Sequence, residues 1–203
     1  MTEALRSDTI IADKNTVVKP ESVFCFGSGS RGDSYIAEGA GRFLREKDCF
    51  PVIIGMERLD EEACGDLADA LGLPCARFLS GSTSPYVMAG ILHELDLLVT
   101  SRYHACVLGM QAGVPAVAVS MDERLDGILK ELHMEDEYLF HVADADLGEE
   151  IHDALERAFR ERSAIAEKMA RQVVIYRERL RDMGVFVKGY IADGLKRGSP
   201  PNA

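Results

Sequence analysis

The sequence has no tryptophan, and only 7% of its 203 residues are aromatic. No apolar run approaches the roughly 20 residues that a membrane-spanning helix needs, and residues 1–20 lack the apolar stretch of a signal peptide. Its five cysteines are odd in number and form no Cys-x-x-Cys pair, which argues against a disulfide framework or a zinc site. We therefore expect reduced thiols, a cytoplasmic location and no membrane span.

Basic residues are the scarcer charge, with 23 Lys and Arg against 34 Asp and Glu and a net charge of -11. The acidic excess is greatest in residues 121–160, whereas residues 161–203 carry more basic than acidic side chains. Proteins that bind nucleic acid present a basic stripe on the folded body, so we exclude nucleic acid as the main partner. We interpret the basic terminal segment as a solvated helix face.

Apolar runs of strand length alternate with amphipathic helical patterns along the chain. This alternation predicts βαβ units and a parallel sheet, and nearly continuous apolar strands indicate a sheet covered on both faces. We expect one Rossmann-like, three-layer α/β domain with a parallel sheet of about six strands. The strand-like runs are 23–26, 52–54, 75–79, 97–100 and 116–119, with a weaker one at 138–142, and the helical patterns are 34–47, 60–71, 85–94, 102–112 and 123–133.

Two of these helices carry clear stop signals, because Gly72 and Gly113 are each followed by a proline two residues later. Apolar residues at helical spacing predict a long last helix over residues 146–183. We therefore divide the chain into a flexible arm or linker at 1–20, a Rossmann-like domain at 21–183 that includes this helix, and a tail at 184–203.

The first loop of the predicted sheet matches the Gly-x-Gly-x-x-Gly pattern of dinucleotide-binding proteins at residues 27–32. Glu57 follows the second strand, where a ribose ligand would stand. The pattern alone is weak, and an anionic Asp33 beside a pyrophosphate is unfavourable. We interpret the loop as a turn that positions Arg31, and keep a dinucleotide site as a distant alternative.

The loop at 80–85 is a second candidate for binding an anion. Ser84 is a natural N-cap with Pro85 at the first helical position. Free backbone N–H groups there, together with hydroxyls such as that of Ser82, could cradle a phosphate or a carboxylate. Plain helix capping explains the same residues equally well.

The switch from strand to helix at residues 100–104 carries the most informative side chains. Arg102 is the only Lys or Arg from Phe78 to Glu123, and a lone cation at such a turn is where an α/β fold receives an anion. We expect Ser101 to cap the helix, with Arg102 and His104 in its first turn and leaning over its N-terminal end. Arginine offers a planar fork for a carboxylate or phosphate, and histidine transfers protons near neutral pH.

Residues 96–105, 112–119 and 122–127 resemble the C-terminal half of polysaccharide pyruvyl transferases, through Ser-Arg-x-His followed by a Gly-Val-Pro strand. The resemblance covers about residues 23–140. The family has a glycosyltransferase-B-like fold of two Rossmann-like halves and moves a pyruvyl group from phosphoenolpyruvate to a sugar. It implies a transferase, or its donor-binding half, acting on a sugar of a cell-surface polysaccharide, with phosphoenolpyruvate as donor substrate. We expect no cofactor, and the spacing of the histidines leads us to expect no metal.

The resemblance also implies roles for individual residues. Arg102 and His104 match the pair that holds and activates phosphoenolpyruvate, and Arg124 stands where the family often has a lysine. The N-terminal half of the fold is missing, so we expect a partner domain or a homo-oligomer to supply it. The expected catalytic residues are His104 and Arg102, and the expected substrate-binding residues are Ser101, Arg31, Ser82, Ser84 and Arg124.

Two other classes of function fit the same sequence. A nucleotide-sugar glycosyltransferase half would use the same fold, with an acidic side chain such as Asp122 holding the donor ribose. A non-catalytic assembly module would use the long basic helix instead of the loops.

Overall fold

The computed structural model describes residues 10–13, 16–18, 23–27, 33–120, 123–141 and 146–198. Its centre is a parallel six-stranded sheet in the order β5-β4-β3-β6-β7-β8. The strands are β3 (Val23–Gly27), β4 (Phe50–Gly55), β5 (Ala76–Leu79), β6 (Leu97–Thr100), β7 (Ala116–Ser120) and β8 (Leu139–His141).

The strand order reverses between β3 and β6, because the chain builds outward from β3 through β4 and β5 and then returns to place β6 on its other side. In parallel α/β sheets, ligands bind outside the carboxyl ends of the strands at such a reversal. Gly27 of β3 lies opposite Thr100 of β6 in the register. The reversal therefore lies beside the loop that carries Arg102.

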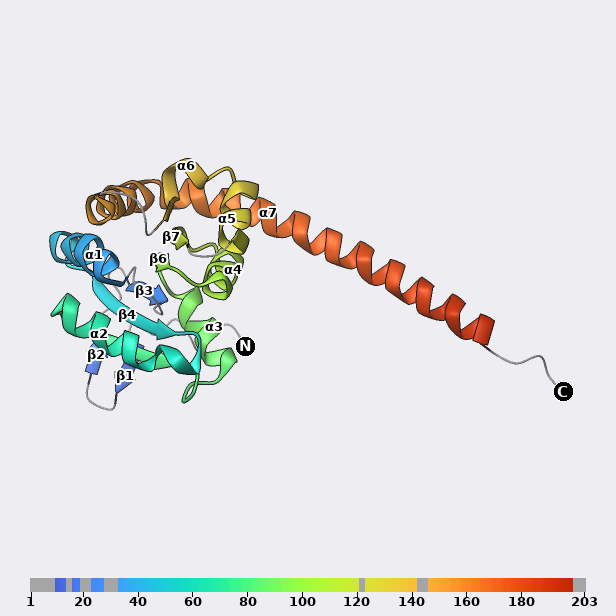
Figure 1. Cartoon of the computed structure of the whole chain (residues 1–203), viewed down its shortest axis with the longest axis horizontal. Helices are drawn as coiled ribbons and strands as arrows, with labels where there is room; N and C mark the ends of the chain where they lie inside the picture. Colours follow the sequence, from blue (N-terminus) through green and yellow to red (C-terminus); the bar gives the residue numbers. More distant parts are fainter. Residues whose placement is uncertain are drawn as a thin grey trace.

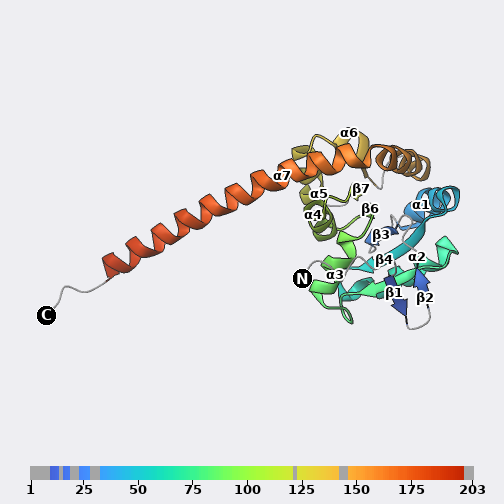
Figure 2. The same cartoon turned by 180° about the vertical axis from the view of Figure 1, so that it is seen from behind.

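Helices cover both faces of the sheet. Right-handed crossovers place α1 and α2 on one face and α3, α4 and α5 on the other, and α1 packs against both α2 and α7. The early part of α7 lies along α1 in both views (Figures 1 and 2). The helices are α1 (Asp33–Lys47), the 3-10 turn η1 (Arg58–Asp60), α2 (Glu61–Leu71), α3 (Pro85–His93), α4 (Tyr103–Ala112), α5 (Glu123–Glu131), α6 (Glu135–Tyr138) and α7 (Leu147–Gly198).

The central strands are apolar because both of their faces are covered. Every residue of β6 and β7 is buried, which explains why these strands show no polar alternation. The predicted helix stops are confirmed, since Gly72 and Gly113 adopt the left-handed conformation at φ 61° and 77° and cap α2 and α4.

The structure corrects the prediction at both ends of the chain. Within the expected flexible arm, β1 (Ile10–Asp13) pairs antiparallel with β2 (Thr16–Val18). The predicted tail is also wrong up to Gly198, because α7 continues 15 residues past Met183. A helix crosses an isolated glycine at a cost of about 1 kcal/mol, so Gly184 weakens the helix without ending it.

The 52-residue helix α7 is the longest element. Its first part packs against the body through buried residues that include Ile151, Leu155, Met169 and Val173. Its last part leaves the body and stands clear of it (Figure 1). Over the residues that the structure describes, no helix combines the length and the apolarity needed to cross a bilayer.

Candidate functional site

The candidate site begins where β6 ends at the reversal of strand order. The side-chain oxygen of the buried Thr100 accepts a hydrogen bond from the Arg102 N–H at 2.9 Å. The prediction that Ser101 caps α4 is wrong, because Arg102 itself occupies the N-cap position with an extended backbone at φ -106° and ψ 121°. Thr100 holds the loop in this shape, so the helix begins at Tyr103, one residue later than expected.

The Arg102 guanidinium lies between two carboxylates. Its Nη2 donates a hydrogen bond to Oδ1 of Asp60, and its Nη1 lies 3.5 Å from Oε1 of Glu57. The Asp60 side chain is only 1% exposed, whereas that of Glu57 is 58% exposed. The buried Asp60 carboxylate therefore fixes the position of the guanidinium, and the solvent-exposed Glu57 carboxylate forms a second, longer ion pair with it.

Asp60 is in turn held by the backbone. Its Oδ2 accepts a hydrogen bond from the Glu57 N–H at 2.9 Å, inside the turn η1 that follows β4. Because β3 separates β4 from β6, the pair of Asp60 and Arg102 crosses the carboxyl end of β3. Gly55 makes room for this arrangement, since a Cβ atom there would come within 3.2 Å of the Asp60 Cβ and 2.8 Å of a Leu79 methyl carbon.

His104 lies on the first turn of α4 and its side chain is exposed. Its ring packs edge-on against the ring of Tyr103, with 5.4 Å between the ring centroids. The guanidinium of Arg124, at the start of α5, lies over the same tyrosine ring at 5.2 Å. His104 and Arg124 thus both contact the Tyr103 ring, and the His104 imidazole is accessible to a substrate.

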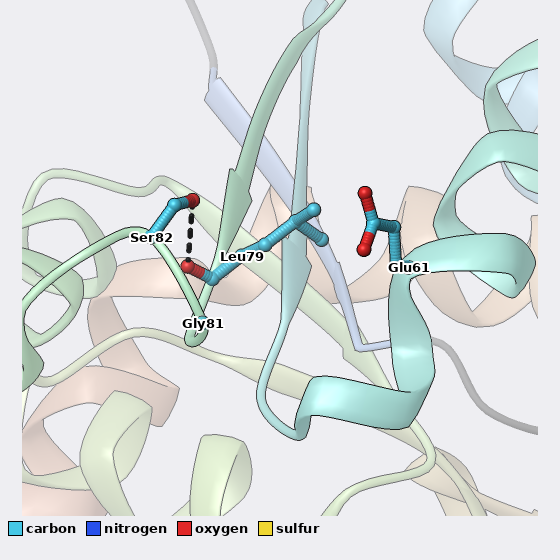
Figure 3. Close-up of a pocket in the computed structure, with 4 residues that line it drawn as sticks. All are labelled: Glu61, Leu79, Gly81 and Ser82. Atoms are coloured by element: carbon cyan, nitrogen blue, oxygen red, sulfur yellow. Dashed lines mark hydrogen bonds between the residues drawn. The ribbon is translucent and has the colours of Figure 1, made fainter.

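The loop between β5 and α3 borders a pocket of about 370 Å³ at the same edge of the sheet. Its lining includes Glu61, Leu79, Gly81 and Ser82, and Figure 3 shows the Glu61 carboxylate and the Leu79 side chain on facing sides. The Ser82 hydroxyl donates a hydrogen bond to the Leu79 carbonyl at 3.3 Å. Since Glu61 follows Asp60 directly, this pocket adjoins the residues that hold Arg102.

The structure describes some of the other predicted binding residues and not others. The Ser84 hydroxyl accepts a hydrogen bond from the Val87 N–H at 3.3 Å and caps α3, which confirms the capping prediction. Ser101 is half-buried in the loop beside Arg102. Arg31 and Asp122 lie outside the described residues, so their predicted roles stay predictions.

Sequence reasoning missed a polar group at the neighbouring strand ends. The hydroxyl of Ser120, which ends β7, hydrogen-bonds to the Asp126 carboxylate and lowers the pKa of that carboxyl, with a smaller contribution from His141. The His141 Nε2 lies 3.4 Å from Asp126 Oδ2. Asp126 belongs to the 122–127 run that carried the family resemblance, and this was the available signal. Nothing in the sequence paired His141 with it.

A second cluster lies away from this edge, between the end of α1 and the beginning of α7. The buried His152 places its Nε2 2.9 Å from Oε2 of Glu46, and Glu46 also pairs with Arg42 at 3.0 Å. Lys47 pairs with Glu156 at 2.9 Å. Glu46, His152 and Glu156 are close enough together to ligate a metal ion. Cationic side chains already neutralise both carboxylates, so we interpret the cluster as an ionic brace between the two helices.

The parallel α/β domain resembles glycosyltransferase-B domains, which confirms the expected architecture. Residues 46–123 match the family described as polysaccharide pyruvyl transferase. This segment contains Asp60, Arg102 and His104, so the resemblance seen in the sequence is confirmed there. No curated protein sequence gives a significant match to the chain.

Solved structures of low sequence identity share the fold. The catalytic domain of cholesterol-alpha-glucosyltransferase from Helicobacter pylori is 16% identical with a TM-score of 0.55, over 76% of this chain and 98% of that one. The C-terminal CMP-Kdo binding domain of WaaA from Acinetobacter baumannii is 12% identical with a TM-score of 0.52, over 74% and 86%. A putative UDP-N-acetylglucosamine 2-epimerase from Listeria monocytogenes is 14% identical with a TM-score of 0.50, over 74% and 40%. Likeness at this level shows the fold alone.

Proposed function

We propose that this chain supplies the donor-binding half of a transferase that moves a pyruvyl group from phosphoenolpyruvate to a sugar of a cell-surface polysaccharide. The observation that carries the proposal is the position of Arg102 and His104 at the reversal of strand order, inside the segment that matches the pyruvyl transferase family. Ligands of parallel α/β sheets bind at this position.

The chemistry of the donor suits these side chains. Phosphoenolpyruvate carries a carboxylate and a phosphate, so its site needs cationic forks and backbone N–H groups. Arg102 stands at the N-terminus of α4, where the positive end of the helix dipole adds to its charge. Arg124, Ser82 and Arg31 are the further donor-binding residues that we propose.

The reaction requires protons to enter and leave in a fixed order. Protonation of the donor methylene carbon by an acid makes a methyl group and leaves an oxocarbenium-like carbon next to it. A sugar hydroxyl attacks that carbon and releases its proton to a base. The bond between carbon and phosphate oxygen then breaks and phosphate leaves. A second hydroxyl of the sugar attacks the same carbon and gives its proton to the departing phosphate, which completes the ketal. His104 is an exposed group beside Arg102 that can exchange such protons.

The two carboxylates that contact Arg102 have different roles in the proposed reaction. Asp60 is buried and hydrogen-bonded through both oxygens, so we assign it as a positioning residue that keeps the guanidinium at the sheet edge. Glu57 is solvated and more distant, so a donor carboxylate or phosphate can take its place on Nη1. Replacing one weak surface ion pair by another costs little.

Calorimetry with phosphoenolpyruvate tests the proposal. We expect binding by the wild-type chain and a loss of about tenfold in affinity, or roughly 1.4 kcal/mol, for Arg102→Lys, because lysine keeps the charge but loses the planar fork. Arg171→Lys on the exposed surface of α7 is the matched control. Arg102→Lys also leaves Asp60 with a cationic partner, so the variant is expected to fold.

His104 needs a separate variant because binding and proton transfer are different functions. His104→Gln is expected to keep donor binding and to lose exchange of the donor methylene protons with deuterated solvent, which NMR follows directly. The exposed His93→Gln is its control. Absence of any heat with phosphoenolpyruvate in the wild-type chain would overturn donor binding by this chain.

A nucleotide-sugar glycosyltransferase half is the second candidate. The observation that favours it is the similarity in fold to a glucosyltransferase domain and to a CMP-Kdo binding domain. A rise in melting temperature with CMP, UDP or GDP, without one for phosphoenolpyruvate, would select this candidate over the first.

A further inference from the structure

Residues 177–194 of α7 are exposed and pack against none of the other residues that the structure describes. Among the α7 residues up to 194, whose burial the structure describes, Val173 is the last that is buried, and every residue from 177 to 194 is exposed. Figures 1 and 2 show this stretch pointing away from the body in opposite views. We call residues 177–194 the protruding segment.

The protruding segment is too apolar for a helix that stays in water. A helix exposed all round normally carries polar side chains, and contiguous apolar patches mark sites of interaction. An isolated helix of this length is also marginal without packing. The exposed large apolar residues here are Leu180, Met183, Val185, Phe186, Val187, Tyr190 and Ile191.

The spacing of these residues identifies the kind of surface that covers them. Val173, Tyr176, Leu180, Met183, Val187 and Tyr190 recur at alternating steps of three and four, and we call this row the seam. A row with a period of 3.5 keeps facing one neighbour when two helices supercoil, whereas packing on a globular body uses a wider stripe. The spacing therefore favours another helix as the partner.

We propose that the protruding segment pairs with the same segment of a second copy of this chain, antiparallel, about a two-fold axis. The base of the seam faces its own body, since Val173 is buried and the Tyr176 hydroxyl donates a hydrogen bond to Glu131. A parallel partner would bring its own body into that same space. Antiparallel pairing places the two bodies at opposite ends.

The antiparallel register brings the apolar residues of the two copies into contact with one another. With the axis between Met183 and Val187, Met183 of one copy faces Val187 of the other, and Leu180 faces Tyr190. The positions beside the seam then bring Phe186 next to Phe186 of the second copy. Such self-complementary contacts are what a two-fold interface requires.

The charged residues beside the seam fit the same register. Arg179 of one copy lies beside Asp193 of the other, and symmetry repeats this pair at both ends. Opposite charges at the flanks of a helix pair select the partner and its orientation. Gly184 stands close to the axis on the other side, where it lets the two backbones approach.

Molecular mass in solution tests the pairing on the full chain. We expect the wild-type chain to run as a dimer in size-exclusion chromatography with light scattering, and Leu180→Glu to run as a monomer. Val185→Glu is a matched control, because Val185 is 66% exposed like Leu180 but lies on the opposite side from the seam. Circular dichroism checks that both variants keep their helix. A monomeric wild type, or a dimer unaffected by Leu180→Glu, overturns the proposal.

Charge reversal tests the orientation. Arg179→Asp alone and Asp193→Arg alone should each weaken the dimer, because each puts like charges side by side, and the double variant should restore it. Failure of the double variant to restore the dimer overturns the antiparallel register. These outcomes are independent of phosphoenolpyruvate binding, so they stand or fall separately from the proposed function.

Discussion

At the scale of single residues, the balance of charge around Arg102 decides how strongly the edge of the sheet attracts an anion. Asp60 and Glu57 together outweigh its one positive charge. The buried partner fixes geometry, whereas the exposed partner competes with any incoming carboxylate or phosphate. The two acidic residues are therefore expected to have opposite effects on the proposed donor.

We predict that Glu57→Gln raises the affinity for phosphoenolpyruvate. Removing a solvated carboxylate 3.5 Å from Nη1 should help by about 0.5 kcal/mol, or roughly twofold, as expected for an exposed ion pair. Calorimetry at low and high salt measures it, and the gain should shrink as salt screens the charges. Glu62→Gln, in the first turn of α2, is the control. Weaker binding by Glu57→Gln would mean that Glu57 contacts the donor itself.

The sequence indicated the location of this site but not its internal contacts. The alternation of strand and helix placed Arg102 and His104 at a strand end, which the structure confirms. Asp60 lies 42 residues away in the chain, in a short 3-10 turn that carries no pattern linking it to an arginine. The wrong prediction of a helix cap at Ser101 has a similar origin. The shape of this loop depends on the hydrogen bond that the buried Thr100 hydroxyl accepts from the Arg102 N–H.

At the scale of elements, strongly apolar segments were predicted well and the long helix poorly. β6 was expected at 97–100 and is found there, because a buried strand between turn residues has few alternatives. The end of α7 was misplaced, because a glycine ends a helix where it adopts the left-handed conformation, as Gly72 and Gly113 do and Gly184 does not. The helix therefore continues to Gly198, although Val185, Phe186 and Val187 are weaker helix formers than alanine.

The crossing of α1 and α7 gives a prediction about packing. A Cβ atom at Gly39 would collide with the Gly148 carbonyl oxygen and come within 3.0 Å of Ile151. Backbone cannot move aside cheaply, so Gly39→Ala should destabilise the chain by about 1–3 kcal/mol. Gly65→Ala, inside α2 with its nearest neighbour 3.9 Å away, should instead stabilise it by about 0.5–1 kcal/mol. Urea unfolding compares them, and equal effects would contradict the close approach.

The ionic brace between the same helices predicts a dependence on pH. Hydrogen bonds from His152 and then Arg42 lower the pKa of the Glu46 carboxyl below its ordinary value of 4.5. A lowered carboxyl pKa stabilises the folded chain above pH 4.5 and ceases to do so as pH falls through the folded-state value. Wild type should therefore be more stable than Glu46→Gln at neutral pH, and the gap should close on acidification. A gap that is independent of pH would contradict this.

At the scale of the whole molecule, the chain has two regions with different origins of stability. The body is a sheet covered by helices on both faces, and its parallel arrangement was predicted from the alternation of strand and helix patterns in the sequence. The protruding segment contributes no burial to that body, so its helix depends on its own hydrogen bonds and on a partner. The excess of basic side chains in residues 161–203 predicted a solvated helix face, whereas the seam residues in the same region recur every 3.5 residues.

This division predicts the effect of shortening the chain. Ending it at Glu178 removes exposed residues and keeps the contact of Tyr176 with Glu131. The thermal midpoint of the body, followed by near-ultraviolet circular dichroism, should therefore stay within about 2 °C, a shift that corresponds to less than 1 kcal/mol. Dimerisation should be lost at the same time, because the four seam residues from Leu180 to Tyr190 are gone.

A second truncation provides the control for this prediction. Ending the chain at Ala164 removes the buried side chains of Ile165, Met169 and Val173, each worth about 1.5–3 kcal/mol of burial. This shorter chain should melt far lower or fail to fold. A large drop already at Glu178 would contradict the division, because it would mean that the body depends on the protruding segment through the contacts of the dimer.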